Sequence, residues 1–390
     1  MKQYAISTPK GTKDILYDAC LTRRTVESRL SKLFTARGYD EIITPTLEYY
    51  DVFQESGTIT QEEVYKLVDN TGRILVLRPD MTTPIARVAA TKLAGADFPQ
   101  RLYYIQNVFR TGTNLPHGSE FTQAGVELLG AVGVRADTEV IALAIESLSR
   151  VSGKYSVEIG HAEFFKALVK SLGTSDAFNE ELRTLVEGKN FAALNDLLAP
   201  YADYPAYEAL RRLPQLFGGE EVLDEALELA RGCVGVEEID YLRAIFRELT
   251  AAGFSDNSMI DLGLVQHIHY YTGVVFRGYA DGIGASVLNG GRYDTLTGLY
   301  GKSMPATGFA IGVDELCQCA EKEFPVKKNY LIHTESGYLR KAMDYMDRHR
   351  PGQCELSPCE TVEETKALAA ARGIAYVVVI GASGATTLEA

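Results

Sequence analysis

The sequence contains no tryptophan and only six histidines. It also has no excess of basic residues, since 39 lysines and arginines are outnumbered by 52 acidic residues. A formal net charge of -13 argues against a general nucleic-acid surface, since such surfaces neutralise phosphates with lysine and arginine. No stretch approaches the roughly 20 apolar residues of a membrane span, and the first residues lack the apolar core of a signal peptide. We expect a cytoplasmic protein with neither membrane nor nucleic acid as a partner.

The six cysteines are scattered and form no paired C-x2-C framework, and a cytoplasmic chain keeps such thiols reduced. Cys317 and Cys319 fall in an expected helix, where residues two apart face different ways, which disfavours a metal site. His267 and His269 would share one strand face, but no third ligand stands nearby, so structural or solvent-facing roles are expected for them. We expect no metal and no cofactor.

With 390 residues, the chain is long for a single core, and two or three domains are expected. An apolar stripe predicts a helix over 17–36, and Gly38 then ends it. The further expected elements are strands 41–45, 72–77, 101–110, 121–129 and 155–159, helices 85–93 and 137–150, an all-helical stretch from 163 to about 253, and a final β-α-β-α-β region after 325 that ends in a loop-like segment, 381–390.

Two polar residues share one face of the strand 121–129. Gln123 and Glu127 are four residues apart, and side chains alternate along a strand. A glutamate on an otherwise buried strand needs a partner, and an amine or an imidazole would serve. Thr82 and Thr83, just before Pro84, are suited either to a ligand site or simply to starting a helix.

The stretch 261–315 is rich in glycines that interrupt strand-like runs at 274–279 and 285–288. Polar and aromatic residues gather at the same places: Tyr270, Tyr271, Asn289, Arg292, Tyr293 and Asp294. One interpretation is an antiparallel meander whose tyrosines are ordinary half-buried strand residues. The other is a stretch in which the backbone approaches a ligand closely.

Several motifs, in their order and spacing, resemble the catalytic core of class II histidyl-tRNA synthetases: PKGTKDIL, GYDEIITPTLE, LRPDMTTPIAR, RLYYIQNVFR with FTQAGVELLG, YYTGVVF, NGGRYD and PATGFAIGVDEL. The resemblance covers about residues 5–320. It implies an α+β fold with a six- or seven-stranded antiparallel sheet flanked by helices, a helical insertion and a small C-terminal α/β domain. The implied domains are 1–163 with 254–322, then 164–253, then 326–390, the last resembling an incomplete anticodon-binding domain.

The same resemblance implies a histidine pocket. Its residues in this chain would be Asp80, Thr82, Arg110, Gln123, Glu127, Tyr271 and Tyr293. A carboxylate and a hydroxyl, from Asp80 and Thr82, suit an α-ammonium group with Gln123 beside it. A second carboxylate and phenols suit both imidazole nitrogens.

The nucleotide-binding side departs from the synthetase pattern. Gln266 stands at an arginine position, Gly112 at the acid position that follows Arg110, and Glu315 at the arginine of the third motif, while residues 115–119 contain no arginine. The loss of three cations should slow adenylation at least ~10^4-fold, which disfavours this activity.

A chain that keeps the residues of a histidine pocket but lacks the cationic residues that bind the nucleotide resembles the family of ATP phosphoribosyltransferase regulatory subunits. That resemblance implies a chain without its own catalytic site that forms a homodimer through the first motif. It would join short catalytic subunits in a hetero-oligomer, activate them in histidine biosynthesis and transmit feedback inhibition by histidine. We hypothesise that the glycine-rich segment 278–291 closes over the ligand. The alternatives are a working histidyl-tRNA synthetase, a synthetase-like enzyme acting on a small carrier, and a plain binding protein.

Overall fold

The computed structural model describes residues 6–56, 59–112, 118–231, 236–265, 271–320, 327–349 and 352–390. The chain divides into two compact units, Met1–Lys322 and Glu323–Ala390, which are described separately. No helix of the described residues is long and apolar enough to cross a membrane. The five cysteines among these residues are all free thiols, and Cys233 lies outside them.

The first unit is built on a nine-stranded sheet in the order β1-β5-β6-β12-β11-β10-β7-β9-β8. Six consecutive strands, from β5 to β7, are antiparallel, which confirms the class II synthetase-like sheet. The pairs β1/β5 and β7/β9 are parallel, and β8 at the edge pairs antiparallel with β9. The strands are β1 Asp40–Glu41, β5 Gln100–Phe109, β6 Glu120–Leu129, β12 Ala306–Gly312, β11 Leu288–Arg292, β10 Val274–Ala280, β7 Tyr155–His161, β9 Ser258–Asp261 and β8 Phe217–Gly218.

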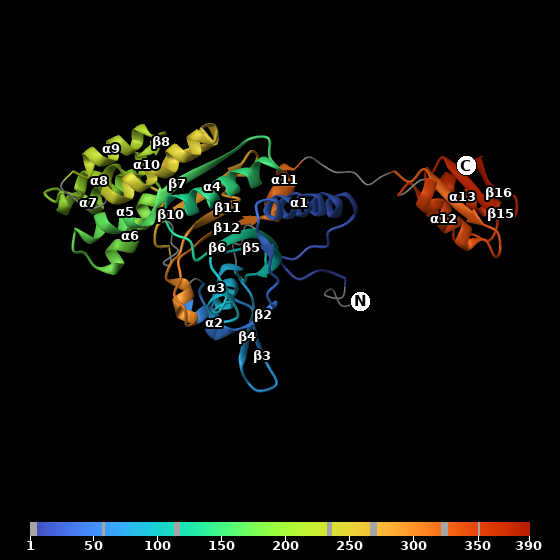
Figure 1. The fold of residues 1–390 in the computed structure, drawn as a ribbon, viewed down its shortest axis with the longest axis horizontal. Coiled ribbons are helices and arrows are strands. Elements are labelled where there is room, and N and C mark those ends of the chain that lie inside the picture. Colours follow the sequence, from blue (N-terminus) through green and yellow to red (C-terminus); the bar gives the residue numbers. More distant parts are fainter. Residues whose placement is uncertain are drawn as a thin grey trace. The chain divides into compact units, whose positions relative to one another are not determined.

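The two faces of this sheet belong to different cores. Along β5, Tyr103 packs into one core while its neighbours Leu102 and Tyr104 pack into the other, because strand side chains alternate. Helices α1 Tyr17–Ala36, α4 Val134–Ser149 and α11 Val313–Cys319 lie along the first face (Figure 1). Helix α3 Thr82–Ala90 and the short helix Leu296–Tyr300 cover part of the second face, where space for a ligand remains.

A small three-stranded sheet follows α1 in sequence and comprises β2 Leu47–Tyr49, β4 Ile74–Leu77 and β3 Lys66–Val68, with α2 Tyr50–Ser56 beside it. The predicted strand 41–45 is wrong in extent, because pairing with β5 stops at Glu41. The inner face of the small sheet carries Val76, which packs with Phe53 and Val64. Its outer face carries exposed apolar side chains.

The predicted helical stretch is confirmed apart from the two-residue strand β8. It contains α5 Ala162–Lys170, α6 Asp176–Glu187, α7 Phe191–Leu198, α8 Tyr207–Arg212, α9 Glu221–Leu229 and α10 Val236–Ala251. Leucines on α6, α7 and α10 belong to the same apolar core as α4 and the sheet. The helical stretch therefore packs directly on the sheet.

The second unit is a four-stranded sheet in the order β14-β13-β15-β16, with strands β13 Tyr330–Thr334, β14 Cys354–Leu356, β15 Tyr376–Gly381 and β16 Gly384–Glu389 and helices α12 Leu339–His349 and α13 Val362–Ala371. The three predicted strands are parallel. The expected loop 381–390 is wrong, because β16 pairs antiparallel with β15. Gly384, at φ +98°, follows the two-residue turn that makes this hairpin possible.

Candidate functional site

Small residues in the middle of the second sheet face leave space for a cavity. Gly308 lies opposite both Glu127 and Gly291 on the two neighbouring strands, and Ala310 lies opposite Gly125. A Cβ atom on Gly308 would overlap the Glu127 carboxylate, and one on Gly291 would come within 2.8 Å of the Tyr271 ring. Glycine is thus required where neighbouring side chains lie across the strand.

The cavity has a volume of about 210 Å³. All seven residues predicted for the histidine pocket line it: Asp80, Thr82, Arg110, Gln123, Glu127, Tyr271 and Tyr293. They come from both ends of the hairpin β5/β6, from the start of α3 and from the segments flanking β10 and β11. Residues separated by as much as 213 positions therefore meet at one site, counting from Asp80 to Tyr293.

Glu127 is the most buried carboxylate of the cavity, with 1% of its surface exposed. Its Oε1 accepts a hydrogen bond from Thr82 Oγ1 at 2.9 Å, and its Oε2 accepts one from the Tyr293 hydroxyl. Burial raises the pKa of Glu127 to about 8, while the two hydroxyl donors lower it and nearby Asp80 raises it further. At neutral pH this carboxyl group therefore largely retains its proton.

The contacts of Asp80 show whether Thr82 and Thr83 serve to start helix α3 or to line the ligand site. Its Oδ1 accepts the Thr83 N–H at 2.8 Å and its Oδ2 accepts the Thr83 hydroxyl at 3.2 Å, so Asp80 satisfies the start of α3. Thr82 is then not needed as a cap, and its hydroxyl turns to Glu127. Burial raises the pKa of Asp80, while the hydrogen bond from the Thr83 amide and the charge of Arg110 oppose that shift.

The other end of the cavity contains Arg110, Phe121 and Glu315. Arg110 Nε donates to the Pro79 carbonyl oxygen at 2.9 Å, and its guanidinium lies 5.9 Å from the centre of the Phe121 ring. Glu315, on α11, has only 6% of its surface exposed. This end therefore places a carboxylate where the synthetase motif has an arginine.

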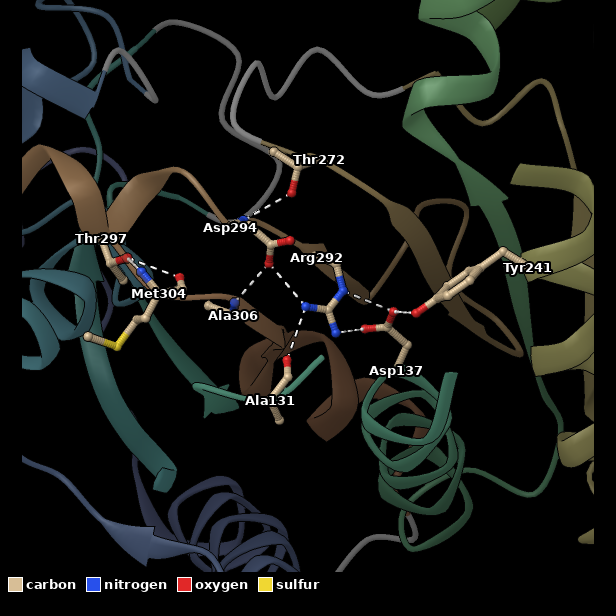
Figure 2. A network of polar contacts seen from close by, with 9 residues as sticks. All are labelled: Ala131, Asp137, Tyr241, Thr272, Arg292, Asp294, Thr297, Met304 and Ala306. Carbon is tan, nitrogen blue, oxygen red and sulfur yellow. Dashed lines mark hydrogen bonds and ion pairs between the residues drawn. The ribbon is translucent and has the colours of Figure 1, made fainter. Parts of the chain in front are cut away.

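The backbones of Tyr271 and Tyr293 are joined by a polar network on residues next to them. Thr272 N–H donates to the Arg292 carbonyl oxygen at 2.8 Å, and Asp294 N–H donates to Thr272 Oγ1 at 3.0 Å. Figure 2 shows the Arg292 guanidinium between Asp137 and Asp294. The tyrosine rings thus line the cavity while their neighbours are held by buried ion pairs.

Sequence reasoning did not name part of the lining, namely Phe121, Ser286, Val287, Gly312 and residues 308–311, while it had named Asn289 in the glycine-rich stretch and Glu315 on the nucleotide side. The alternation of small residues in Pro305–Gly312 was the available signal for the hollow face. Half of the hypothesised moving segment 278–291 is paired, since Gly278 lies opposite Leu288 and Gly290 opposite Phe276, and residues 281–287 lie between the strands. Gln266, His267, His269 and Tyr270, with 115–117 of the loop, lie outside the described residues.

Among the described residues, no group of three or more histidine, cysteine, aspartate or glutamate side chains is placed to hold a metal ion. The chemistry available in the cavity is therefore that of carboxyl, hydroxyl, amide and guanidinium groups around a small ligand.

Comparisons with known proteins identify the family of this chain. The sequence profile described as Histidyl-tRNA synthetase matches residues 11–316. A protein of Clostridium acetobutylicum named ATP phosphoribosyltransferase regulatory subunit is 40% identical over 92% of this chain and 91% of its own length. A protein of the same name from Clostridium kluyveri is 43% identical over 80% of this chain and 82% of its own length.

Solved structures give the same result. A structure from Bacillus halodurans, described as an ATP phosphoribosyltransferase regulatory subunit/histidyl-tRNA synthetase, superposes with a TM-score of 0.83 at 31% identity and covers 94% of this chain and 97% of that one. Histidyl-tRNA synthetase from Nostoc sp. PCC 7120, at 20% identity and a TM-score of 0.75 over 98% of this chain and 94% of that one, shares the fold. The chain belongs to the histidyl-tRNA synthetase family and, within it, is a relative of the ATP phosphoribosyltransferase regulatory subunits.

Proposed function

We propose that this chain is a regulatory subunit without a catalytic site of its own, which binds histidine in the cavity, activates a short ATP phosphoribosyltransferase catalytic subunit and transmits feedback inhibition by histidine. The observation that supports it best is the convergence of Asp80, Thr82, Gln123, Glu127 and the two tyrosines on one cavity. The names of the relatives support the choice of partner.

The polar groups of the cavity suit the two ends of histidine. Asp80 offers a carboxylate to the α-ammonium group, with the Gln123 amide beside it. Glu127, which retains a proton at neutral pH, offers a donor to one imidazole nitrogen. The Tyr271 and Tyr293 phenols stand on the same wall and can address the ring and its second nitrogen.

Adenylation is the second candidate, because solved relatives carry the synthetase name. The described part of the cavity is lined by the acidic side chains of Asp80 and Glu315, by the protonated Glu127 and by the single guanidinium of Arg110. Arg110 already donates to the Pro79 carbonyl oxygen. Stabilising a triphosphate as charge develops requires preorganised cations, and losing one such donor typically costs ~10^2- to 10^3-fold in rate. We therefore favour regulation over catalysis.

Regulation by histidine requires that the ligand bind two states of the complex with different affinity. Loop 281–287, between β10 and β11, includes the lining residues Ser286 and Val287 and is a candidate for the element that differs between the states. A catalytic subunit that favours one position of this loop would thereby change the affinity for histidine, and histidine would change the activity of that subunit.

A second copy of the chain is the expected additional partner. The outer face of the small sheet exposes Leu47, Tyr49 and Leu67 to 46%, 46% and 43%, and Ile43 just before it to 78%. Exposed apolar patches of this kind mark protein interfaces. Ile43 and Leu47 of this patch lie in the segment 38–48 that follows α1, in the first motif through which dimerisation was predicted. Leu67→Glu should lower the mass measured by light scattering from twice 42.8 kDa to 42.8 kDa, with Leu339→Glu in the second unit as the control.

The function is tested by mixing the chain with a short catalytic subunit and measuring phosphoribosyl-ATP formation with and without histidine. We expect the mixture to be more active than the catalytic subunit alone and histidine to suppress the gain. ATP-pyrophosphate exchange with histidine should remain at background. Exchange at an enzymatic rate by this chain alone would contradict the regulatory proposal and establish the synthetase alternative.

A further inference from the structure

The polar network next to the cavity extends into the helical stretch. Arg292 precedes Tyr293 in sequence, so its side chain leaves β11 on the opposite face, where 6% of its surface is exposed. Arg292 Nε donates to Asp137 Oδ2 at 3.0 Å and its Nη2 to Asp137 Oδ1 at 2.8 Å. This bidentate pair joins the strand to α4 beneath it.

Tyr241 contributes the contact from the helical stretch. Its hydroxyl, on α10, donates to Asp137 Oδ2 at 2.6 Å, and its ring lies edge-on to His161 with 6.0 Å between centroids. Figure 2 shows Tyr241 approaching Asp137 from the side opposite Asp294. A chain of hydrogen bonds therefore runs from α10 through Asp137 to Arg292.

On its other side, Arg292 contacts both segments that carry the cavity phenols, the Tyr293 segment through its guanidinium and the Tyr271 segment through its backbone carbonyl. Arg292 Nη1 donates to Asp294 Oδ1 at 3.0 Å, the same oxygen that accepts the Ala306 N–H at 3.0 Å. The Tyr293 N–H donates to the Ala306 carbonyl oxygen at 2.7 Å. Thr272, bonded to the Arg292 carbonyl and the Asp294 amide, follows Tyr271 directly. Each cavity tyrosine is thus adjacent in sequence to residues of the network.

We propose that Tyr241 and Arg292 are positioning residues for the cavity, through which the helical stretch fixes where the Tyr271 and Tyr293 phenols stand relative to Glu127. The inference rests on the proposed function, since histidine is the ligand whose affinity reports the position of the phenols. Buried ion pairs often contribute to stability alone. The Arg292–Asp137 pair differs because Arg292 is also hydrogen-bonded to Thr272 and Asp294, which are adjacent in sequence to the two phenols. The helical stretch then becomes a region from which histidine affinity can be altered at a distance.

The test is calorimetric titration of histidine into the full chain, the Tyr241→Phe variant and a Tyr204→Phe control, whose half-exposed ring lies elsewhere in the helical stretch. Tyr241→Phe keeps the ring against His161 and removes only the hydroxyl. We expect it to weaken histidine binding about fivefold, in the range of couplings through contiguous networks, and the control to leave it unchanged. Equal affinity in all three proteins would overturn the inference.

A double-mutant cycle separates positioning from general destabilisation. If Tyr241 acts through Tyr293, the effect of Tyr241→Phe should disappear in a Tyr293→Phe background, because residues coupled in one network are not additive. Arg292→Lys, which keeps the charge but loses the bidentate geometry, should weaken binding more than Tyr241→Phe. Additive losses in the cycle would show that Tyr241 supports the fold only.

The ligand-free protein provides a separate measurement. Amide hydrogen exchange over 271–277 and 288–295 should be faster in Tyr241→Phe than in the unaltered chain and the Tyr204→Phe control. Absence of histidine binding in the unaltered chain would contradict the proposed function, while this exchange measurement would still decide the positioning role. Unchanged exchange in Tyr241→Phe would refute it.

Discussion

The cavity has a Glu127 end and a Glu315 end on the same face of the sheet, and the charged groups at the two ends have different hydrogen-bond partners. At the Glu127 end, two hydroxyl groups from Thr82 and Tyr293 converge on one buried carboxyl group. At the Glu315 end, Arg110 donates to a backbone carbonyl and the nearby carboxyl group belongs to α11. Gln123, on β6 between Phe121 and Glu127, lies about 13 Å from Glu127 along the strand. We propose that the first end receives a small polar ring, while among the described residues the second end offers Arg110 as its one guanidinium.

The largest effect is expected from Glu127→Ala. The change removes the acceptor of two hydroxyl groups and the proposed donor to the imidazole, so histidine affinity should fall about 100-fold, near the upper end of the cost of leaving buried polar groups without their partner. Calorimetric titration measures it, with Glu355→Ala on the surface of the second unit as the control. Unchanged histidine affinity would show that Glu127 does not contact the ligand, and the contrast between the two ends of the cavity would then have no role in binding.

Gly308→Ala tests the hollow face without removing a polar group. The new methyl group would overlap the Glu127 carboxylate and force it from the Thr82 and Tyr293 hydroxyls. Overpacking of this kind costs about 1–3 kcal/mol, and we expect a loss of about tenfold in histidine affinity together with a lower melting temperature. Gly153→Ala, where no atom lies within 4 Å of the added methyl group and which lies outside both the cavity and loop 281–287, is the matched control. Equal histidine affinities in the two variants would show that a side chain at position 308 does not disturb the cavity.

The pH dependence of stability tests the Glu127 end alone. A carboxyl group whose pKa rises from 4.5 to about 8 on folding binds more protons in the folded chain. Its contribution to stability is therefore complete below about pH 4.5 and is lost as the pH rises to about 8, with a slope of at most about 1.4 kcal/mol per pH unit.

Urea unfolding of the unaltered chain and Glu127→Gln at several pH values measures this slope. Asp80, whose pKa is also raised, is present in both proteins, so the difference between the two curves reports Glu127 together with its coupling to Asp80. We expect the unaltered chain to lose stability relative to Glu127→Gln between pH 5 and 8. Parallel curves would show that Glu127 ionises normally.

The smallest effect is expected from Glu315→Gln. Its carboxylate lies at the end away from Glu127, so histidine affinity should change by less than about threefold, the scale of a distant and largely independent site. The same titration measures it, and Thr82→Val in parallel should weaken binding more because that hydroxyl contacts Glu127 directly. A larger loss in Glu315→Gln than in Thr82→Val would reverse the roles assigned to the two ends.

Local pattern was enough for the elements with strong periodicity. The helix 17–36 with Gly38 after it, the hairpin 101–129 and the helical stretch from 163 were predicted from spacing and stop signals. The strand β16 was missed because most of its residues are exposed, so no apolar alternation marks it. The run 285–288 was placed too early because Gly290 and Gly291 have low strand propensity, yet both are paired in β11.

The sequence by itself determined that Gln123 and Glu127 face the same way, since alternation along a strand is a local property. The motifs also indicated which seven residues would gather at the site. Only the tertiary structure decided that Thr82, 45 residues before Glu127, and Tyr293, 166 residues after it, are the hydroxyl partners of that carboxyl group. It also decided that Asp80 occupies the start of α3 and that Gly308 makes room across the sheet. Such contacts depend on strand register and packing between distant segments, which no short stretch of sequence encodes.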